Sequence, residues 1–187
     1  LDGETMLLPD LFWTIATQNS LEFEGTYPLP EAQLDRFLFK LVVEYPDAAA
    51  EKQMLVNAQK GFRGKSQDLD RVKAIATVED ILMARQAVQG VNVDDKVLDY
   101  LLGLVRQTRQ HPDLALGASG RSAVAWLQAS KAHAWLAGKT FVTPDDVKAV
   151  AVPLLRHRLI LKPEAQLDGV AIDAVIAGLL KQVAVPR

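Results

Sequence analysis

Three polar side chains stand at positions where they could act on a charged ligand. Asn19 follows an apolar run of strand length at 12–17, and its amide offers both donor and acceptor groups. Arg36 directly precedes a second apolar run at 37–43, and Arg121 lies in the first turn of a predicted helix. A guanidinium is permanently charged and can bind two phosphate oxygens at once. These residue types therefore indicate chemistry on a phosphate group.

Each of the three residues also has a purely structural explanation. Asn often bonds its own backbone in a turn, so Asn19 could serve only the loop that it opens. Arg36 could pair with the nearby acids Asp35 or Glu31. Arg121 could be solvated, although a cation at a helix N-terminus opposes the helix dipole, a cost that is easier to understand if an anion docks there. The residues alone leave both explanations open.

The segments around Asn19 and Arg36 predict elements that would position them. The two apolar runs predict strands at 12–17 and 37–43. Between them lie an acidic loop with Gly and Pro at 22–30 and a helix-like turn at 31–36. In an open α/β sheet, ligands bind beyond the carboxyl ends of the strands, which is where Asn19 stands.

The rest of the chain predicts a helical bundle. Capping residues and apolar spacing predict helices at 48–59, 78–89, 95–110, 120–136, from 144 onwards and at 165–183, capped by Asp47, Thr77, Asp94, Ser119 and Thr143. The helix at 120–136 is predicted to bury the apolar face formed by Val124, Leu127, Ala129, Ala132 and Leu136. A short strand is predicted at 156–161.

Other conspicuous residues have structural interpretations. The three tryptophans stand in apolar patterns and are interpreted as core residues: Trp13, Trp126 and Trp135. His133, among Ala and Trp on a helix, is interpreted as a packed or surface residue rather than a catalytic one. The cluster Arg156-His157-Arg158 is interpreted as a solvated strand edge.

Composition excludes several classes of function. The chain has 187 residues and a net charge of -2, from 21 basic and 23 acidic side chains, so nothing draws it generally to nucleic acid or to an anionic membrane. It contains no Cys, and its three His are too far apart in sequence to suggest a metal site. No apolar run is long enough to span a bilayer, and a cytoplasmic protein is expected. No phosphate-cradling G-x-x-x-x-G-K-[ST] loop occurs.

Two stretches, ATQN at 16–19 and EGTYPLPEAQLDRF at 24–37, together resemble the MoxR family of AAA+ ATPases. The resemblance implies that Asn19 is the sensor 1 residue and that Arg36 is the arginine finger. A third stretch, GASGR at 117–121, is similar to the sensor 2 motif, which implies that Arg121 folds over the nucleotide of its own subunit. Family members usually have Pro where this chain has Gly120, so the turn should be less stiff here.

The resemblance also implies a fold. It is mostly α: a remnant of the AAA+ α/β core at 1–45 with the two strands, a linker helix and boundary at 46–64, and a helical lid domain at 65–187. Residues 1–9 are either a hairpin arm or a ragged end. Two strands with exposed edges should make 1–45 self-associate or pack unusually, whereas the helical part should fold on its own.

The expected function is that of an ATPase of which this chain is the C-terminal part. The resemblance implies ATP and Mg²⁺ as cofactors, with the phosphate loop and the metal-binding acids upstream of Leu1. The chain alone is therefore expected to be inactive and to bind no cofactor. A finger that acts on the next subunit requires a ring or a filament with a heterologous interface. The expected assembly is a ring, a hexamer, that works on a protein client.

Two other functions stay open. The chain could be a non-catalytic assembly or adaptor module, in which the three motifs serve packing. It could also belong to a magnesium-chelatase-type motor, which shares the LDRF finger, although the ATQN and EGTYPLPEAQ strings argue for MoxR.

Overall fold

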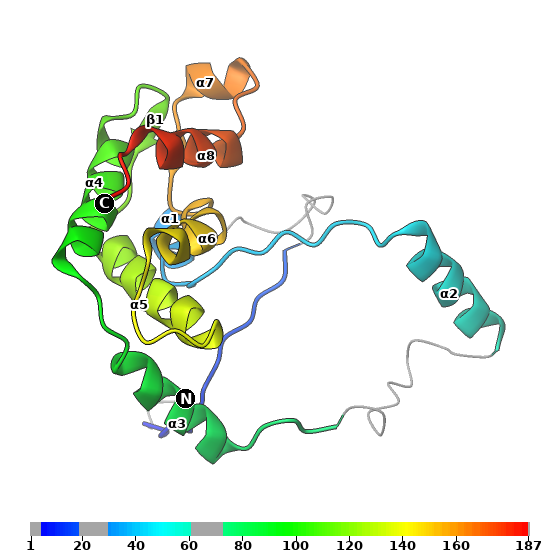
Figure 1. Ribbon diagram of the computed structural model, residues 1–187. Helices are drawn as coiled ribbons and strands as arrows, with labels where there is room; N and C mark the ends of the chain where they lie inside the picture. Colours follow the sequence, from blue (N-terminus) through cyan, green and yellow to red (C-terminus); the bar gives the residue numbers. More distant parts are fainter. Residues whose placement is uncertain (1–4, 19–29, 61–72, 187) are drawn as a thin grey trace. The chain divides into compact units, whose positions relative to one another are not determined.

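The computed structural model of the chain describes residues 5–18, 30–60 and 73–186 (Figure 1). The chain divides into two compact units. One contains Leu1–Lys40 and Met83–Arg187, and the other contains Leu41–Leu82. Asn19 lies outside the described residues.

The smaller unit contains α2 (Ala48–Gln59) and the start of α3 (Val78–Gln89). The Asp47 carboxylate caps α2 by accepting a hydrogen bond from the amide of Ala50 at 2.8 Å. At the start of α3, the Thr77 hydroxyl accepts a hydrogen bond from the Asp80 amide, and Asp80 accepts one from the Thr77 amide. Both helices begin where their capping residues predict, which confirms these two boundaries. Neither helix has a buried residue.

The larger unit is a helical bundle around a single apolar core. Its principal helices are α4 (Asp95–Gln110), α5 (Gly120–Leu136), α6 (Pro144–Leu155) and α8 (Ile172–Gln182) (Figure 1). The most extensive helix–helix packing joins α5 to α6. The core residues that are at most 2% exposed include Leu104, Val105, Trp126, Val147, Leu154, Leu155 and Ile176.

The buried face of α5 coincides with the predicted one only in part: Ala129 is buried and Leu127 packs against the core. Val124 and Leu136 are 61% and 78% exposed, while Trp126 and Ser130 are buried. The indole Nε1 of Trp126 donates a hydrogen bond to the Val147 carbonyl at 2.7 Å, which orients this face of α5 toward α6. Apart from Trp126, the buried residues of α5 are small, namely Ser122, Ala129, Ser130 and Ala134, so a count of large apolar side chains does not locate this face.

The start of α6 is anchored by a buried carboxylate. Asp146 is 0% exposed and accepts hydrogen bonds from the amide and hydroxyl of Thr143, at 2.8 and 2.6 Å. It also binds Lys139 Nζ at 3.0 Å and His133 Nδ1 at 2.8 Å. Burial alone would raise the pKa of Asp146, but these hydrogen bonds outweigh it and hold the pKa well below its usual range. His133 is predicted to be a packed or surface residue, and its side chain is 43% exposed and binds Asp146.

A short antiparallel ribbon joins distant parts of the bundle. The strand β1 (Leu114–Leu116) pairs with β2 (Ile160–Leu161), and the Lys162 amide extends the pairing to the Asp113 carbonyl. β1 directly precedes the GASGR stretch at 117–121, and β2 begins two residues after Arg158. The ribbon therefore brings two segments that are far apart in sequence to the same end of the bundle.

Several local predictions are wrong, although the mostly helical fold class is confirmed. The described parts of 12–17 and 37–43 form no strands, because a strand needs a hydrogen-bonding neighbour and no described residue pairs with them. Trp13 accordingly is 66% exposed rather than part of the core. Described residues 5–9 form no hairpin, and 1–4 lie outside the described part.

The predicted helix at 165–183 is interrupted. It divides into α7 (Pro163–Leu167) and α8, because Gly169 adopts a positive φ of 75° that ends α7. Within the described residues, no helix has both the length and the apolar character needed to cross a bilayer.

Candidate functional site

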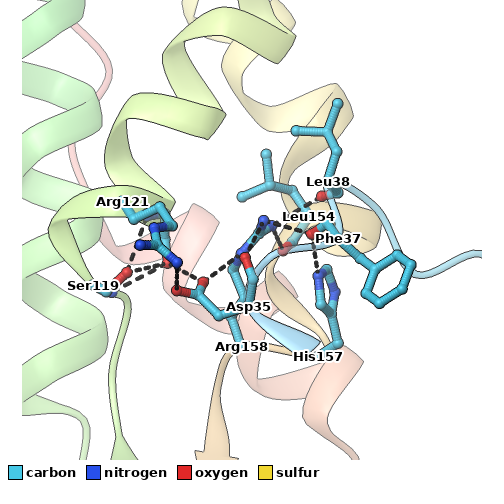
Figure 2. A network of polar contacts seen from close by, with 9 residues as sticks. Asp35, Phe37, Leu38, Ser119, Arg121, Leu154, His157 and Arg158 are labelled. Atoms are coloured by element: carbon cyan, nitrogen blue, oxygen red, sulfur yellow. Dashed lines mark hydrogen bonds and ion pairs between the residues drawn. The ribbon is translucent and has the colours of Figure 1, made fainter. Parts of the chain in front are cut away.

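An ion pair joins the LDRF segment to the end of the bundle. The Arg158 Nε donates to Asp35 Oδ1 at 2.9 Å, and the Arg158 side chain is only 3% exposed (Figure 2). Asp35 follows α1 (Glu31–Leu34), the helical turn that the sequence predicts. Burial lowers the pKa of Arg158, while the adjacent Asp35 carboxylate opposes this effect. A buried guanidinium paired in this way is a fixed structural cation.

The same guanidinium also holds the backbone after α1. Arg158 Nη2 donates to the Phe37 carbonyl at 2.6 Å and to the Asp35 carbonyl at 3.2 Å. Nη1 donates to the Leu38 carbonyl at 2.9 Å. A single side chain therefore satisfies backbone acceptors on both sides of Arg36.

The C-terminus of α6 explains why a cation and an extended segment meet here. The last carbonyls of a helix have no partner within it, and they carry partial negative charge. Arg158 Nη1 donates to the Leu154 carbonyl, and the Lys40 amide donates to the Pro153 carbonyl at 2.9 Å. The segment at 35–40 and Arg158 together complete the end of α6.

His157 adds a second contact to the same segment. Its Nε2 lies 2.9 Å from the Phe37 carbonyl, and because a carbonyl only accepts, Nε2 carries the proton (Figure 2). Burial lowers the pKa of His157, and the positive charges of Arg158 and Lys40 lower it further. The hydrogen bond to the Phe37 carbonyl acts in the opposite direction and raises the pKa. The imidazole is therefore held in its neutral form.

Arg121 faces Asp35 from the other side. Its Nη1 lies 4.0 Å from Asp35 Oδ2, and its side chain is 63% exposed (Figure 2). Ser122 is buried at the start of α5, and its hydroxyl lies 3.4 Å from Asp35 Oδ1. Figure 2 shows Asp35 between Arg121 and Arg158, so one carboxylate is shared by the two arginines.

The first turn of α5 is held firmly despite Gly120. Ser119 and Ser122 form a reciprocal capping box, in which each hydroxyl accepts from the other residue's amide. The preceding loop is tied to α4, since the Ala118 amide donates to the Thr108 hydroxyl at 2.9 Å. Arg109 Nε donates to the Ala118 carbonyl at 2.9 Å. These bonds fix the point from which Arg121 extends.

Gly117 allows the loop to lie this close to α4. A Cβ at Gly117 would stand 2.7 Å from the backbone of Arg109, which no side chain can occupy without displacement. The glycine in the GASGR stretch that the packing requires is therefore Gly117. Gly120 has open space around its Cβ position.

A cavity of about 580 Å³ lies beside this network. Its lining includes the polar groups of Glu31, Asp35, Arg109, Ser119, Ser122 and Arg158. A ligand here would meet both arginine and carboxylate groups at the junction of α1, β1 and α5. Within the described part of the chain, no three His, Cys, Asp or Glu side chains cluster closely enough to hold a metal ion.

The structure describes two of the three predicted site residues, Arg36 and Arg121. Arg36 is exposed on the turn after α1, and its guanidinium makes no hydrogen bond or ion pair with any described residue. The alternative pairing with Asp35 is not formed, because Asp35 faces Arg158 and Arg121 instead. Arg121 stands across Asp35 from Arg158. The prediction for Asn19 falls on a residue outside the described ranges.

Sequence reasoning missed Arg158. The cluster at 156–158 was expected to be a solvated edge, and this is wrong for Arg158, which is buried. Arg156 is 15% exposed and is paired with Asp173 at 2.7 Å. A cationic cluster directly after an apolar helix is a signal for a capped C-terminus, and this signal could have identified it.

Comparisons with known proteins agree with this architecture. Residues 106–179 match the AAA lid domain family, and residues 1–39 match the ATPase family associated with various cellular activities (AAA). The chain is 41% identical over 186 residues to the uncharacterized protein YeaC of Bacillus subtilis, covering 100% of this chain and 57% of that protein. It is 34% identical over 196 residues to chaperone MoxR1 of Mycobacterium tuberculosis, covering 100% of this chain and 50% of that protein.

A solved structure shows the same fold. A crystal structure of a protein from Cytophaga hutchinsonii, assigned as an ATPase, superposes with a TM-score of 0.86 at 31% identity. The match covers 99% of this chain and 58% of that one. The chain thus spans about half the length of the curated relatives that it matches. On these matches, the resemblance seen in the sequence is confirmed: the chain belongs to the MoxR family of AAA ATPases and carries the end of the AAA domain together with the AAA lid.

Proposed function

We propose that the longer protein of which this chain forms part is a ring-forming ATPase, a chaperone-like motor that acts on protein clients in the cytoplasm. The chaperone name of MoxR1 supports the class of function. The proposed ring is a hexamer, and the proposed client is another protein. Neither nucleic acid nor membrane insertion is part of it.

The observation that carries this proposal is that Asp35 and Arg36, which are adjacent in sequence, differ in their contacts. Asp35 is bound within its own chain by Arg158, while the neighbouring Arg36 guanidinium is exposed and unpaired among the described residues. An exposed cation on a fixed turn is suited to reach the phosphates bound to the next subunit in a ring. Such an arginine, supplied in trans, can raise the rate by roughly 10³–10⁵.

Arg121 is proposed to serve the nucleotide of its own subunit. Its side chain is 63% exposed and extends from a capped helix N-terminus beside the cavity. Its only close anion among the described residues is Asp35, at the long distance of 4.0 Å. A phosphate oxygen would therefore compete readily for this guanidinium. Asn19 is proposed to hold the attacking water.

ATP bound with Mg²⁺ would supply the phosphoryl group and its counter-charge. The described residues of this chain fit the phosphate rather than the metal, because they offer arginines without a cluster of acidic ligands. The groups that bind Mg²⁺ are proposed to lie in the remainder of the protein. The chain alone is then expected to be without ATPase activity.

The test is the rate of ATP hydrolysis by the full-length protein and three variants. Arg36→Ala should lower kcat on the order of 10³-fold, and Arg121→Ala should lower both the rate and the affinity for ATP. Arg106→Ala, at an exposed arginine on α4, serves as the matched control and should leave the rate unchanged. Full activity in Arg36→Ala would contradict the role of Arg36, and an absence of ATP hydrolysis by the full-length parent would instead support a non-catalytic assembly module.

A further inference from the structure

We propose that Arg158 is a positioning residue for Arg36, acting through the backbone of residues 35–38. This inference rests on the proposed function, since it explains how Arg36 is positioned to act as the arginine finger. Arg158 itself is 3% exposed and so does not reach a neighbouring subunit.

Packing alone does not fix the turn that carries Arg36. α1 has only four residues and none of them is buried. Short hydrogen bonds within the turn, such as Phe37 amide to Leu34 carbonyl at 3.0 Å, close it locally but do not attach it to the bundle. The attachment must come from other contacts.

Arg158 supplies that attachment on both sides of Arg36. On the N-terminal side it binds the Asp35 carboxylate at 2.9 Å and the Asp35 carbonyl at 3.2 Å. On the C-terminal side it binds the carbonyls of Phe37 at 2.6 Å and Leu38 at 2.9 Å. A planar guanidinium with five fixed donors can hold these acceptors in a single arrangement, whereas an ammonium group cannot.

The guanidinium is itself held in place. Arg158 stands three residues after the end of α6 and two before the start of β2, and it donates to the Leu154 carbonyl. The bundle therefore fixes the position of the Arg158 guanidinium, and the guanidinium fixes the position of the turn that carries Arg36. A misplacement of about 1 Å in a catalytic group can cost roughly 10²-fold in rate.

The experiment is a kinetic comparison in the full-length ATPase. Arg158→Lys keeps the charge but loses the fork, and it should lower kcat about 10- to 100-fold while KM for ATP changes less than about twofold. The double variant Arg36→Ala/Arg158→Lys should be no slower than Arg36→Ala in single-turnover assays, because the guanidinium that Arg158 positions is already absent. Asp173→Asn is the control, since it breaks only the ion pair of Arg156 within the bundle and should leave kcat unchanged.

The outcomes separate the two levels of the proposal. If Arg36→Ala is impaired and Arg158→Lys has the parent kcat, this inference fails and the proposed function stands. A double variant much slower than Arg36→Ala would also overturn it, because the two effects would then be independent. Full activity in Arg36→Ala overturns both.

A second variant covers the case in which Arg158→Lys does not fold, judged by circular dichroism. Asp35→Asn keeps the backbone carbonyls that Arg158 binds and removes the carboxylate charge that Arg158 shares with Arg121, so KM for ATP is measured beside kcat to detect an effect through Arg121. It should lower kcat in the same direction, again without an added effect in the Arg36→Ala background. An unchanged kcat would overturn the inference.

Discussion

The Asp35 carboxylate and the Arg158 guanidinium lie 2.9 Å apart, although 123 residues separate them in the chain. This pair connects the segment that matches the AAA domain to the helical lid. It also orients Asp35 away from Arg36, which leaves the Arg36 guanidinium exposed. The same contact therefore contributes to the fold and to the proposed site.

The Asp35–Arg158 pair should be energetically coupled. Arg158→Gln removes a buried cation and its contacts with backbone carbonyls, so we expect it to lower the free energy of unfolding on the order of 3 kcal/mol. Combining it with Asp35→Asn should cost less than the sum of the single changes, by about 0.5–3 kcal/mol. Denaturant unfolding of the four proteins in a double-mutant cycle measures this coupling. Strict additivity would contradict the contact.

Gly117 and Gly120 should respond oppositely to the same substitution. Gly117→Ala places a methyl group 2.7 Å from the Arg109 backbone, so it should destabilise the protein by about 1–3 kcal/mol. Gly120→Ala has open space at a helix N-terminus and should be neutral or stabilise by about 0.5 kcal/mol. The midpoints of thermal unfolding compare the two variants directly. Equal destabilisation by both would show that the loop does not lie against α4 as described.

His157 should make stability depend on pH below its ordinary pKa of 6.5. Burial lowers its pKa in the folded state, so the unfolded chain binds more protons as the pH falls below that value. Its contribution to stability is therefore complete above pH 6.5 and is lost at lower pH. The amide of Gln in His157→Gln can still donate to the Phe37 carbonyl but does not titrate. This variant should therefore show a smaller fall in thermal unfolding midpoint between about pH 7.5 and about pH 5, the range in which His titrates. An identical pH profile would contradict the buried, neutral imidazole.

Asp146 should govern stability at more acidic pH. Its pKa is held below the ordinary value of 3.8, so its contribution is present above that pH and is lost as the pH falls further. Asp146→Asn should cost on the order of 3 kcal/mol near neutral pH, because Lys139 loses its buried partner. Asp145→Asn, at the adjacent carboxylate that is 88% exposed, is the control and should change little. Chemical unfolding at pH 7 separates the two variants.

The helices were predictable because their signals are local. Asp47, Asp94 and Ser119 cap the helices that they were expected to cap, each through a hydrogen bond to an amide two or three residues away. Gly169 was missed because Ala165 and Val170 continue an apolar helical pattern across it, and only its positive φ reveals the break. The strands at 12–17 and 37–43 failed for the opposite reason, since strand formation depends on partners that local sequence does not specify.

The site was predictable only in part. Arg36 and Arg121 were identified from motifs, and the structure adds that the Arg121 guanidinium lies 4.0 Å from the Asp35 carboxylate. Arg158 was missed because the cationic cluster after α6 signals a capped helix end without specifying which of its arginines is buried. Its burial depends on the docking of residues 35–40, which makes contacts across more than a hundred residues of sequence.

The central claim is that a complete ATPase site is shared between two subunits, with Arg36 supplied by the neighbour. Asn19→Ala should damage a subunit's own site, and Arg36→Ala should damage the next subunit's site. Each variant of the full-length protein should be inactive alone. In an equimolar random mixture, roughly a quarter of the interfaces would combine an intact Asn19 with an intact Arg36.

The most direct measurement is therefore ATP hydrolysis by that mixture, compared with each variant alone and with the parent. The account predicts that the mixture regains about a quarter of the parent rate. No recovery on mixing, or variants that are each as active as the parent, would contradict a shared site.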